Sequence, residues 1–136
     1  MGRKVVNAVS AMALARELGA VADSMADLVG EAQSRLHYSA LIYLCLQKQK
    51  SGSWYLRWRV VGPKHCRPFI DLLSQVGRAK IAMVPPVFQG YILKVEKCAI
   101  ELNHQHAEIL SRIRREQLKQ SELSQLSRLQ DELGFL

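Results

Sequence analysis

Acidic residues are almost absent from the middle of this 136-residue chain. Residues 32–95 contain ten lysines and arginines but a single acid, Asp71, so this segment carries a net charge of +9, against +7 for the whole protein. The two flanking segments are each slightly acidic. Positive charge segregated in this way attracts phosphates, acidic protein surfaces and anionic membranes alike. Charge therefore predicts a polyanionic partner without naming it.

Paired cysteines and long hydrophobic runs are also lacking. The three cysteines, Cys45, Cys66 and Cys98, are an odd number at wide spacings, which favours reduced thiols in the cytoplasm over a disulfide framework. No apolar run approaches the roughly 18 to 20 residues that span a bilayer, so no membrane partner is expected. Arg3 and the apolar residues after it resemble a signal peptide, but polar residues interrupt the run, and we favour a helix there.

Signals of catalysis and of metal binding are missing as well. The chain has no glycine-rich phosphate loop, no nucleophile elbow and no CxxC, HxxxH or HExxH spacing, so we expect neither an enzyme nor a cofactor or metal. Cys66 beside His65 is a weak candidate nucleophile, because adjacent residues rarely form a catalytic pair. His104 and His106 do not share a helix face. His106 falls among apolar positions, which predicts either a buried, hydrogen-bonded histidine or a polar position that specifies an oligomer.

Apolar residues recur at three- and four-residue spacings over most of the chain, which is typical of amphipathic helices. This periodicity and the turn residues predict one domain, residues 1–136, with helices at about 3–18 and 20–48, separated at Gly19. A short helix is predicted at about 69–76, and Pro85 and Pro86 introduce a long helix at about 86–118. Residues 121–136 are predicted to form a separate helix or a tail that packs on a partner.

The long helix carries an apolar seam with alternating four- and three-residue spacings. Its members are Phe88, Ile92, Val95, Ala99, Leu102, His106, Ile109 and Ile113. Two interpretations stay open, since the seam can pack on the N-terminal helices of the same chain or pair with a second copy in a homodimer. The leucines after residue 120 resume the pattern in a different phase.

The period changes from 3.6 to 2 after the loop at residues 50–53, which predicts a strand. Trp54, Trp58 and the apolar residues between them point to one side, whereas Tyr55, Arg57 and Arg59 point to the other. We expect a hairpin over about 53–67, with a turn at residues 62–63 and a short return strand, whose apolar face holds both tryptophans in the core. The predicted fold class is mainly α, a helical bundle with a long C-terminal helix and one β-hairpin insertion.

The basic face of this hairpin is the candidate functional surface. Lysine and arginine neutralise phosphates, and a neighbouring aromatic ring can stack on a base. The predicted nucleic-acid contacts are Lys48, Lys50, Tyr55, Arg57, Arg59, Lys64 and Arg67. We expect DNA rather than RNA. The alternative is an inhibitor or adaptor that docks its basic face on an acidic or nucleic-acid-binding surface of a larger protein complex.

Two short motifs carry resemblances to known families. The strand Leu56-Arg57-Trp58-Arg59 and, more loosely, residues 85–115 with the run Glu96-Lys97-Cys98-Ala99-Ile100-Glu101-Leu102-Asn103 resemble an uncharacterised family of small proteins of bacterial integrative and conjugative elements. The match covers about a third of the chain. The turn after the strand is similar to the arm-type DNA-binding strands of phage and transposon recombinases, which implies that Arg57, Arg59 and Lys64 face DNA. Both resemblances imply an accessory or regulatory protein of a mobile element.

Overall fold

The computed structural model describes residues 2–36, 41–63 and 67–135. Within them, three helices and a three-stranded antiparallel sheet confirm the predicted fold class. The elements in chain order are α1 (Gly2–Leu36), β1 (Ile42–Lys48), β2 (Trp54–Val60), β3 (Phe69–Ile70), α2 (Gln75–Met83) and α3 (Pro86–Glu132). No helix of the described ranges is long and apolar enough to cross a membrane.

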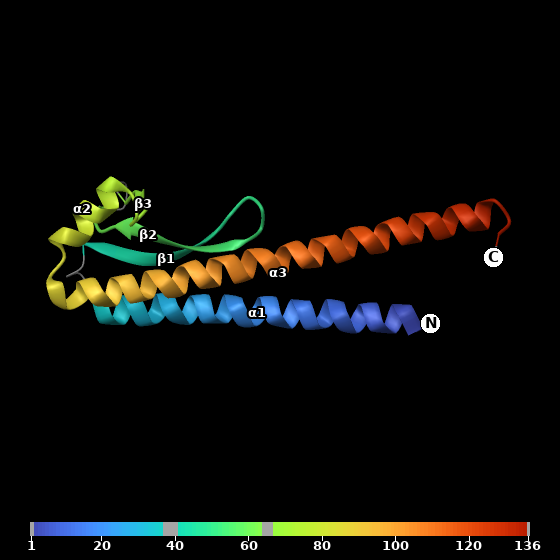
Figure 1. The fold of residues 1–136 in the computed structure, drawn as a ribbon, viewed down its shortest axis with the longest axis horizontal. Helices are drawn as coiled ribbons and strands as arrows, with labels where there is room; N and C mark the ends of the chain where they lie inside the picture. The colour runs from blue at the N-terminus through green and yellow to red at the C-terminus, as the bar shows by residue number, and fades with distance from the viewer. Residues whose placement is uncertain (1, 37–40, 64–66, 136) are drawn as a thin grey trace.

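Helices α1 and α3 lie side by side and run in opposite directions (Figure 1). The sheet packs across this helix pair, with β1 against α1 and β2 against α3. The strand order is β1-β2-β3, so β2 is central. The C-terminal end of α3 extends beyond the first turn of α1 (Figure 1). The molecule is therefore a helix pair that carries a small sheet on one side.

The core forms where the inner face of the sheet meets the two long helices. Met25 and Leu36 come from α1, Leu44 and Trp58 from the sheet, and Ile92 from α3, and all five are buried. Burial of each such side chain stabilises the fold by roughly 1.5 to 3 kcal/mol. Trp54 is half-buried and packs against the same cluster. The prediction that both tryptophans belong to the core is confirmed.

The predicted helix over residues 20–48 is wrong in its last part, because residues 42–48 form β1. Leu44 lies opposite Trp58 in the antiparallel register of β1 and β2. Residues 42–46 are apolar throughout, so they fit a helical period as well as a strand, and only pairing with β2 decides between the two. Gly52 permits the tight connection between these strands with its φ of 88°.

The hairpin is consequently built from β1 and β2 rather than from β2 and a return strand at about 64–67. Residues 64–66 lie outside the described residues, and β2 instead pairs on its other side with β3, Trp58 opposite Ile70. The predicted short helix over 69–76 is wrong, since residues 69–70 form that strand. Helix α2 starts later, where the Ser74 hydroxyl caps it by accepting a hydrogen bond from the Gly77 N–H at 3.0 Å.

Both long helices run through positions where the sequence predicted breaks. Helix α1 continues through Gly19, where a break was predicted, and also through Gly30; both glycines are exposed and have no neighbour near their missing side chains. Glycine costs a helix interior only about 1 kcal/mol, which the remaining residues of α1 offset. Helix α3 likewise continues to Glu132, so the predicted separate helix at 121–136 is wrong.

Candidate nucleic-acid interface

The sheet has one face that the two long helices do not cover. Strand alternation sends Leu56 and Trp58 inward to the helices and sends Tyr55, Arg57 and Arg59 to the opposite side. The register places side chains of β1 and β3 beside them on that side. We call this surface the outer sheet face, and its members are Tyr43, Cys45, Gln47, Tyr55, Arg57, Arg59 and Phe69. It gathers three aromatic rings and two arginines on one small sheet.

Two arginines of the outer sheet face stack on a single aromatic ring. The guanidinium carbons of Arg57 and Arg59 lie 3.9 and 4.0 Å from the centroid of the Phe69 ring. The Nη1 group of Arg57 also donates a hydrogen bond to Gln47 Oε1 at 3.2 Å. Each cation–π contact stabilises its arginine by about 0.5 to 2 kcal/mol. Both guanidinium groups are therefore held in place before a ligand arrives, which lowers the entropic cost of binding.

The thiol of Cys45 lies between these arginines and does not neutralise them. Its Sγ–H donates to the Arg57 carbonyl oxygen at 3.3 Å. Burial raises the pKa of the Cys45 thiol, and this effect exceeds the opposite one of the Arg59 and Arg57 charges. Cys45 therefore stays a neutral thiol near pH 7. In the part of the chain that the structure describes, the one ion pair joins Arg35 to Glu31, so the charge of the outer sheet face is left uncompensated.

The described lysines of the predicted contact set, Lys48 and Lys50, lie apart from this cluster. Lys48 shares the opposite side of the hairpin with Trp54, and its Nζ lies 5.8 Å from the centroid of that indole. Lys50 is exposed in the turn between β1 and β2. Lys64 lies outside the described residues. Of the predicted set, Tyr55, Arg57 and Arg59 thus share one face, while Lys48 and Lys50 border it at the hairpin tip.

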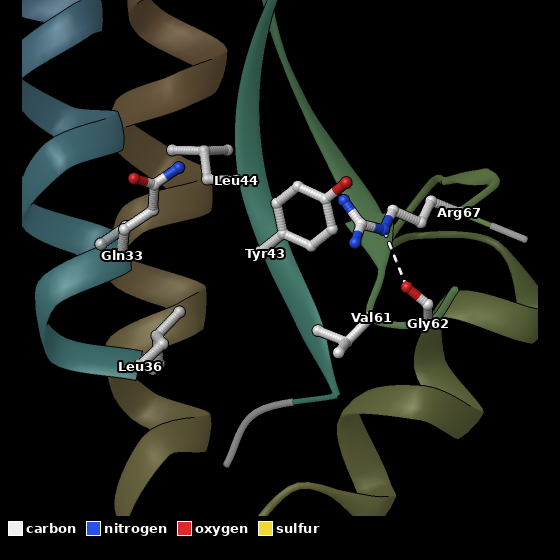
Figure 2. A pocket seen from close by; sticks show the side chains of 8 residues that line it. Gln33, Leu36, Tyr43, Leu44, Val61, Gly62 and Arg67 are labelled. Atoms are coloured by element: carbon white, nitrogen blue, oxygen red, sulfur yellow. Dashed lines mark hydrogen bonds between the residues drawn. The ribbon is translucent and has the colours of Figure 1, made fainter. Parts of the chain in front are cut away.

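Arg67 joins the outer sheet face at the far end of the hairpin, beside a hollow of about 390 Å³ (Figure 2). Its Nε donates to the Gly62 carbonyl oxygen at 2.8 Å, and both Arg67 and Tyr43 line the hollow (Figure 2). Tyr43 in turn lies opposite Arg59 in the register. Leu36, Leu44 and other apolar side chains line the remainder of the hollow. Positive charge therefore continues from Arg57 along the sheet to Arg67.

One edge of β2 is closed by a side chain of α3. Strand β3 pairs only with residues 58 and 59, so on this edge of β2 the backbone N–H and C=O of Leu56 have no strand partner, although β1 pairs with Leu56 on the other edge. Buried Asn103 replaces that partner, because its Oδ1 accepts from the Leu56 N–H at 2.7 Å and its Nδ2 donates to the Leu56 carbonyl at 3.1 Å. A further strand cannot add at this position without displacing Asn103.

His106 lies one turn further along α3 than Asn103, behind the same strand. It is buried, and its Nδ1 lies 3.2 Å from the Ser53 hydroxyl at the start of β2. This confirms the prediction of a buried, hydrogen-bonded histidine. Burial lowers the His106 pKa, so the ring is neutral at pH 7. The apolar seam of α3 is used within the chain here, with Ile92, Val95 and Ala99 also buried.

Three residues of this region were missed at the level of sequence. The sequence assigned Tyr43 and Phe69 to helices. For Asn103, the only signal was a polar residue within a helix rich in apolar residues. No alternation marked Tyr43, because residues 42–46 are apolar throughout. Phe69 and Asn103 gain their roles only through contacts with residues that are distant in sequence, which no local pattern reports.

Neither a metal site nor a comparison with known proteins identifies a function. No group of three histidine, cysteine, aspartate or glutamate side chains that could hold a metal occurs among the described residues. Comparison of the chain with protein families, with curated proteins and with solved structures gives no match. The function must therefore be inferred from the outer sheet face and its surroundings.

Proposed function

We propose that this protein binds nucleic acid through the outer sheet face. The observation that carries the proposal is the stacking of Arg57 and Arg59 on Phe69, on a face that the two long helices leave uncovered and where no acid among the described residues pairs with them. A guanidinium that stacks by its flat side keeps its N–H edge for phosphate oxygens. Because both guanidinium groups lie close to the Phe69 ring, the distance between them is at most about twice the distance of each to the ring. Both can therefore contact one short stretch of a nucleic-acid backbone.

Single strands fit this face better than a duplex. Tyr55 is 38% exposed next to the arginines, and an exposed ring on an open sheet can stack on an unpaired base, which contributes about 1 to 3 kcal/mol per base. A base inside a duplex is already stacked on its neighbours. We retain DNA as the expected strand, in the accessory or regulatory role in a mobile element that the sequence resemblance implies.

The test is a salt titration of binding, measured by fluorescence anisotropy with labelled single-stranded DNA, single-stranded RNA and duplex DNA. Each phosphate contact to a single strand contributes a slope of about 0.7 in a plot of log affinity against log salt. The double variant Arg57→Ala/Arg59→Ala should therefore lower the slope by about 1.4 and weaken binding at least tenfold at low salt. Single-stranded DNA should bind more tightly than duplex.

The matched control is Arg112→Ala/Arg115→Ala, which removes the same charge from exposed positions of α3 beside α1. It should weaken binding only slightly, because it changes the overall field but not the outer sheet face. Equal losses in both double variants would refute the site. Absence of salt-dependent binding to every nucleic acid would refute the function and favour docking on an acidic protein surface.

A further inference from the structure

A cleft of about 480 Å³ opens at the edge of β2 that Asn103 closes. Its walls are this strand edge, the segment 71–73 that follows β3, and one face of α3. Tyr55 and Arg57 line the cleft and also belong to the outer sheet face. The cleft is thus continuous with the proposed nucleic-acid surface. Unlike that surface, it is also lined by two acids, Asp71 and Glu96.

Glu96 is a half-buried acid in this cleft, and it is unusual in so basic a protein. No cation pairs with its carboxyl group among the residues that the structure describes. Burial raises the Glu96 pKa, and the nearby Asp71 carboxylate raises it further. A partly buried carboxylate without a cation beside it is unfavourable. The group is therefore poised to accept hydrogen bonds from a ligand.

A buried donor without an acceptor lies beside Glu96. Trp58 is only 3% exposed, and its indole Nε1 has no hydrogen-bond partner of full geometry within the described ranges. Hydrogen bonding with this indole lowers the Glu96 pKa, so the two groups are close, but Nε1 does not reach full hydrogen-bond geometry with the carboxyl. A donor and an acceptor that satisfy each other only partly therefore lie together at one point of the cleft wall. A ligand that carries adjacent donors and an acceptor would satisfy both.

We propose that this cleft binds an unstacked guanine of a single-stranded nucleic acid, an inference that rests on the proposed function. Guanine presents two neighbouring N–H donors, N1 and N2, which match the two oxygens of a carboxylate, and the O6 acceptor lies next to them. Glu96 accepts from N1 and N2. As its carboxyl group turns toward these donors, O6 approaches the indole N–H of Trp58.

The charges of the site favour a base over other parts of a nucleic acid. Glu96 and Asp71 repel a phosphate from the cleft, whereas Arg57 at its rim attracts one. The backbone would therefore stay on the outer sheet face while one base turns over the edge of β2. Adenine and cytosine each place an acceptor beside their amino group, so neither offers a carboxylate two parallel donors. Guanine is the base that the cleft distinguishes.

The test uses oligothymidylate carrying one central guanine, hypoxanthine or adenine, and affinity is measured by fluorescence anisotropy at fixed salt. Hypoxanthine lacks the 2-amino group but stacks as a purine, so it separates hydrogen bonding from stacking on Tyr55. The guanine oligomer should bind about tenfold more tightly than the adenine one, with hypoxanthine between them. Glu96→Gln should abolish this order, whereas plain oligothymidylate should bind no more weakly than to the unmodified protein, because the removed charge repels phosphate.

Glu101→Gln is the control, because Glu101 is exposed on the same helix and does not line the cleft. It should keep the guanine preference. Equal affinities for the three central bases, or a preference that survives Glu96→Gln, would overturn the guanine site while salt-dependent binding to oligothymidylate still upholds the proposed function. Loss of all binding in the unmodified protein would overturn both. Thermal unfolding of each variant verifies that the fold is intact.

Discussion

Asn103 offers the sharpest test of how this fold is held together. The variant Asn103→Ala removes both hydrogen bonds to the Leu56 backbone, at 2.7 and 3.1 Å, and leaves a buried N–H and C=O without partners. A buried group left unsatisfied costs about 1 to 3 kcal/mol. Water entering through the neighbouring cleft recovers part of this cost, so we expect a loss of about 2 to 4 kcal/mol in the free energy of unfolding. Urea unfolding followed by circular dichroism measures it.

The control for this variant is Gln105→Ala, since Gln105 is exposed two residues further along α3. Its effect should stay within about 0.5 kcal/mol. The urea dependence of the unfolding free energy should be the same in both variants, because neither changes the surface exposed on unfolding. A loss below about 1 kcal/mol for Asn103→Ala would show that water replaces the side chain at this edge, and the closure argument would be wrong.

Four further outcomes are expected. Burial lowers the His106 pKa, so the native state binds fewer protons than the unfolded chain, and the free energy of unfolding should fall as pH drops from about 7.5 to 5.5. Urea unfolding of His106→Gln should show a shallower decline with pH. An unchanged decline would refute this. Gly30→Ala should raise the unfolding free energy by about 0.5 to 1 kcal/mol, whereas Gly77→Ala should lower it by more than that, because its new Cβ would lie 2.6 Å from the Leu72 Cα; calorimetry compares the two, and equal shifts would contradict the packing. Phe69→Leu should weaken binding of single-stranded DNA several-fold without changing its salt slope, since it loosens both arginines but keeps their charge; a lower slope would show that Phe69 acts otherwise. If a homodimer forms through the exposed leucines at the end of α3, Leu126→Ser should lower the mass in sedimentation equilibrium, and exposed Leu73→Ser should not.

Local patterns in the sequence were enough for the helical class and for β2. Alternation over residues 54–60 assigned Trp58 to the core and Arg57 to the other side, and both assignments hold because β2 is buried on one face only. The same logic failed for β1, where an apolar run fits two periods. It also failed at Gly19, where a local propensity of about 1 kcal/mol is outweighed by the packing of α1 against α3 and β1.

The candidate site divides in the same way. Tyr55, Arg57 and Arg59 could be placed together because neighbours at a spacing of two share a strand face. Phe69 comes from the two-residue strand β3, and Glu96 comes from α3, still further along the chain. Such contacts depend on how the chain folds back on itself. The distribution of net charge likewise identified the basic segment. It did not predict that Lys48 lies on the opposite side of the sheet from the arginines.

The position of Phe69 links the fold to the proposed function. Strand β3 is too short to stabilise itself, and it is followed by the turn at Asp71, where the Leu73 N–H donates to Asp71 Oδ1 at 3.0 Å. Gly77 lets α2 approach this turn so closely that a side chain there would overlap the backbone. This packing fixes Phe69 opposite Arg59, and Phe69 in turn fixes both guanidinium groups. A substitution at Gly77 should therefore disturb the outer sheet face without altering any charged residue, because it would free the Phe69 ring on which the arginines stack.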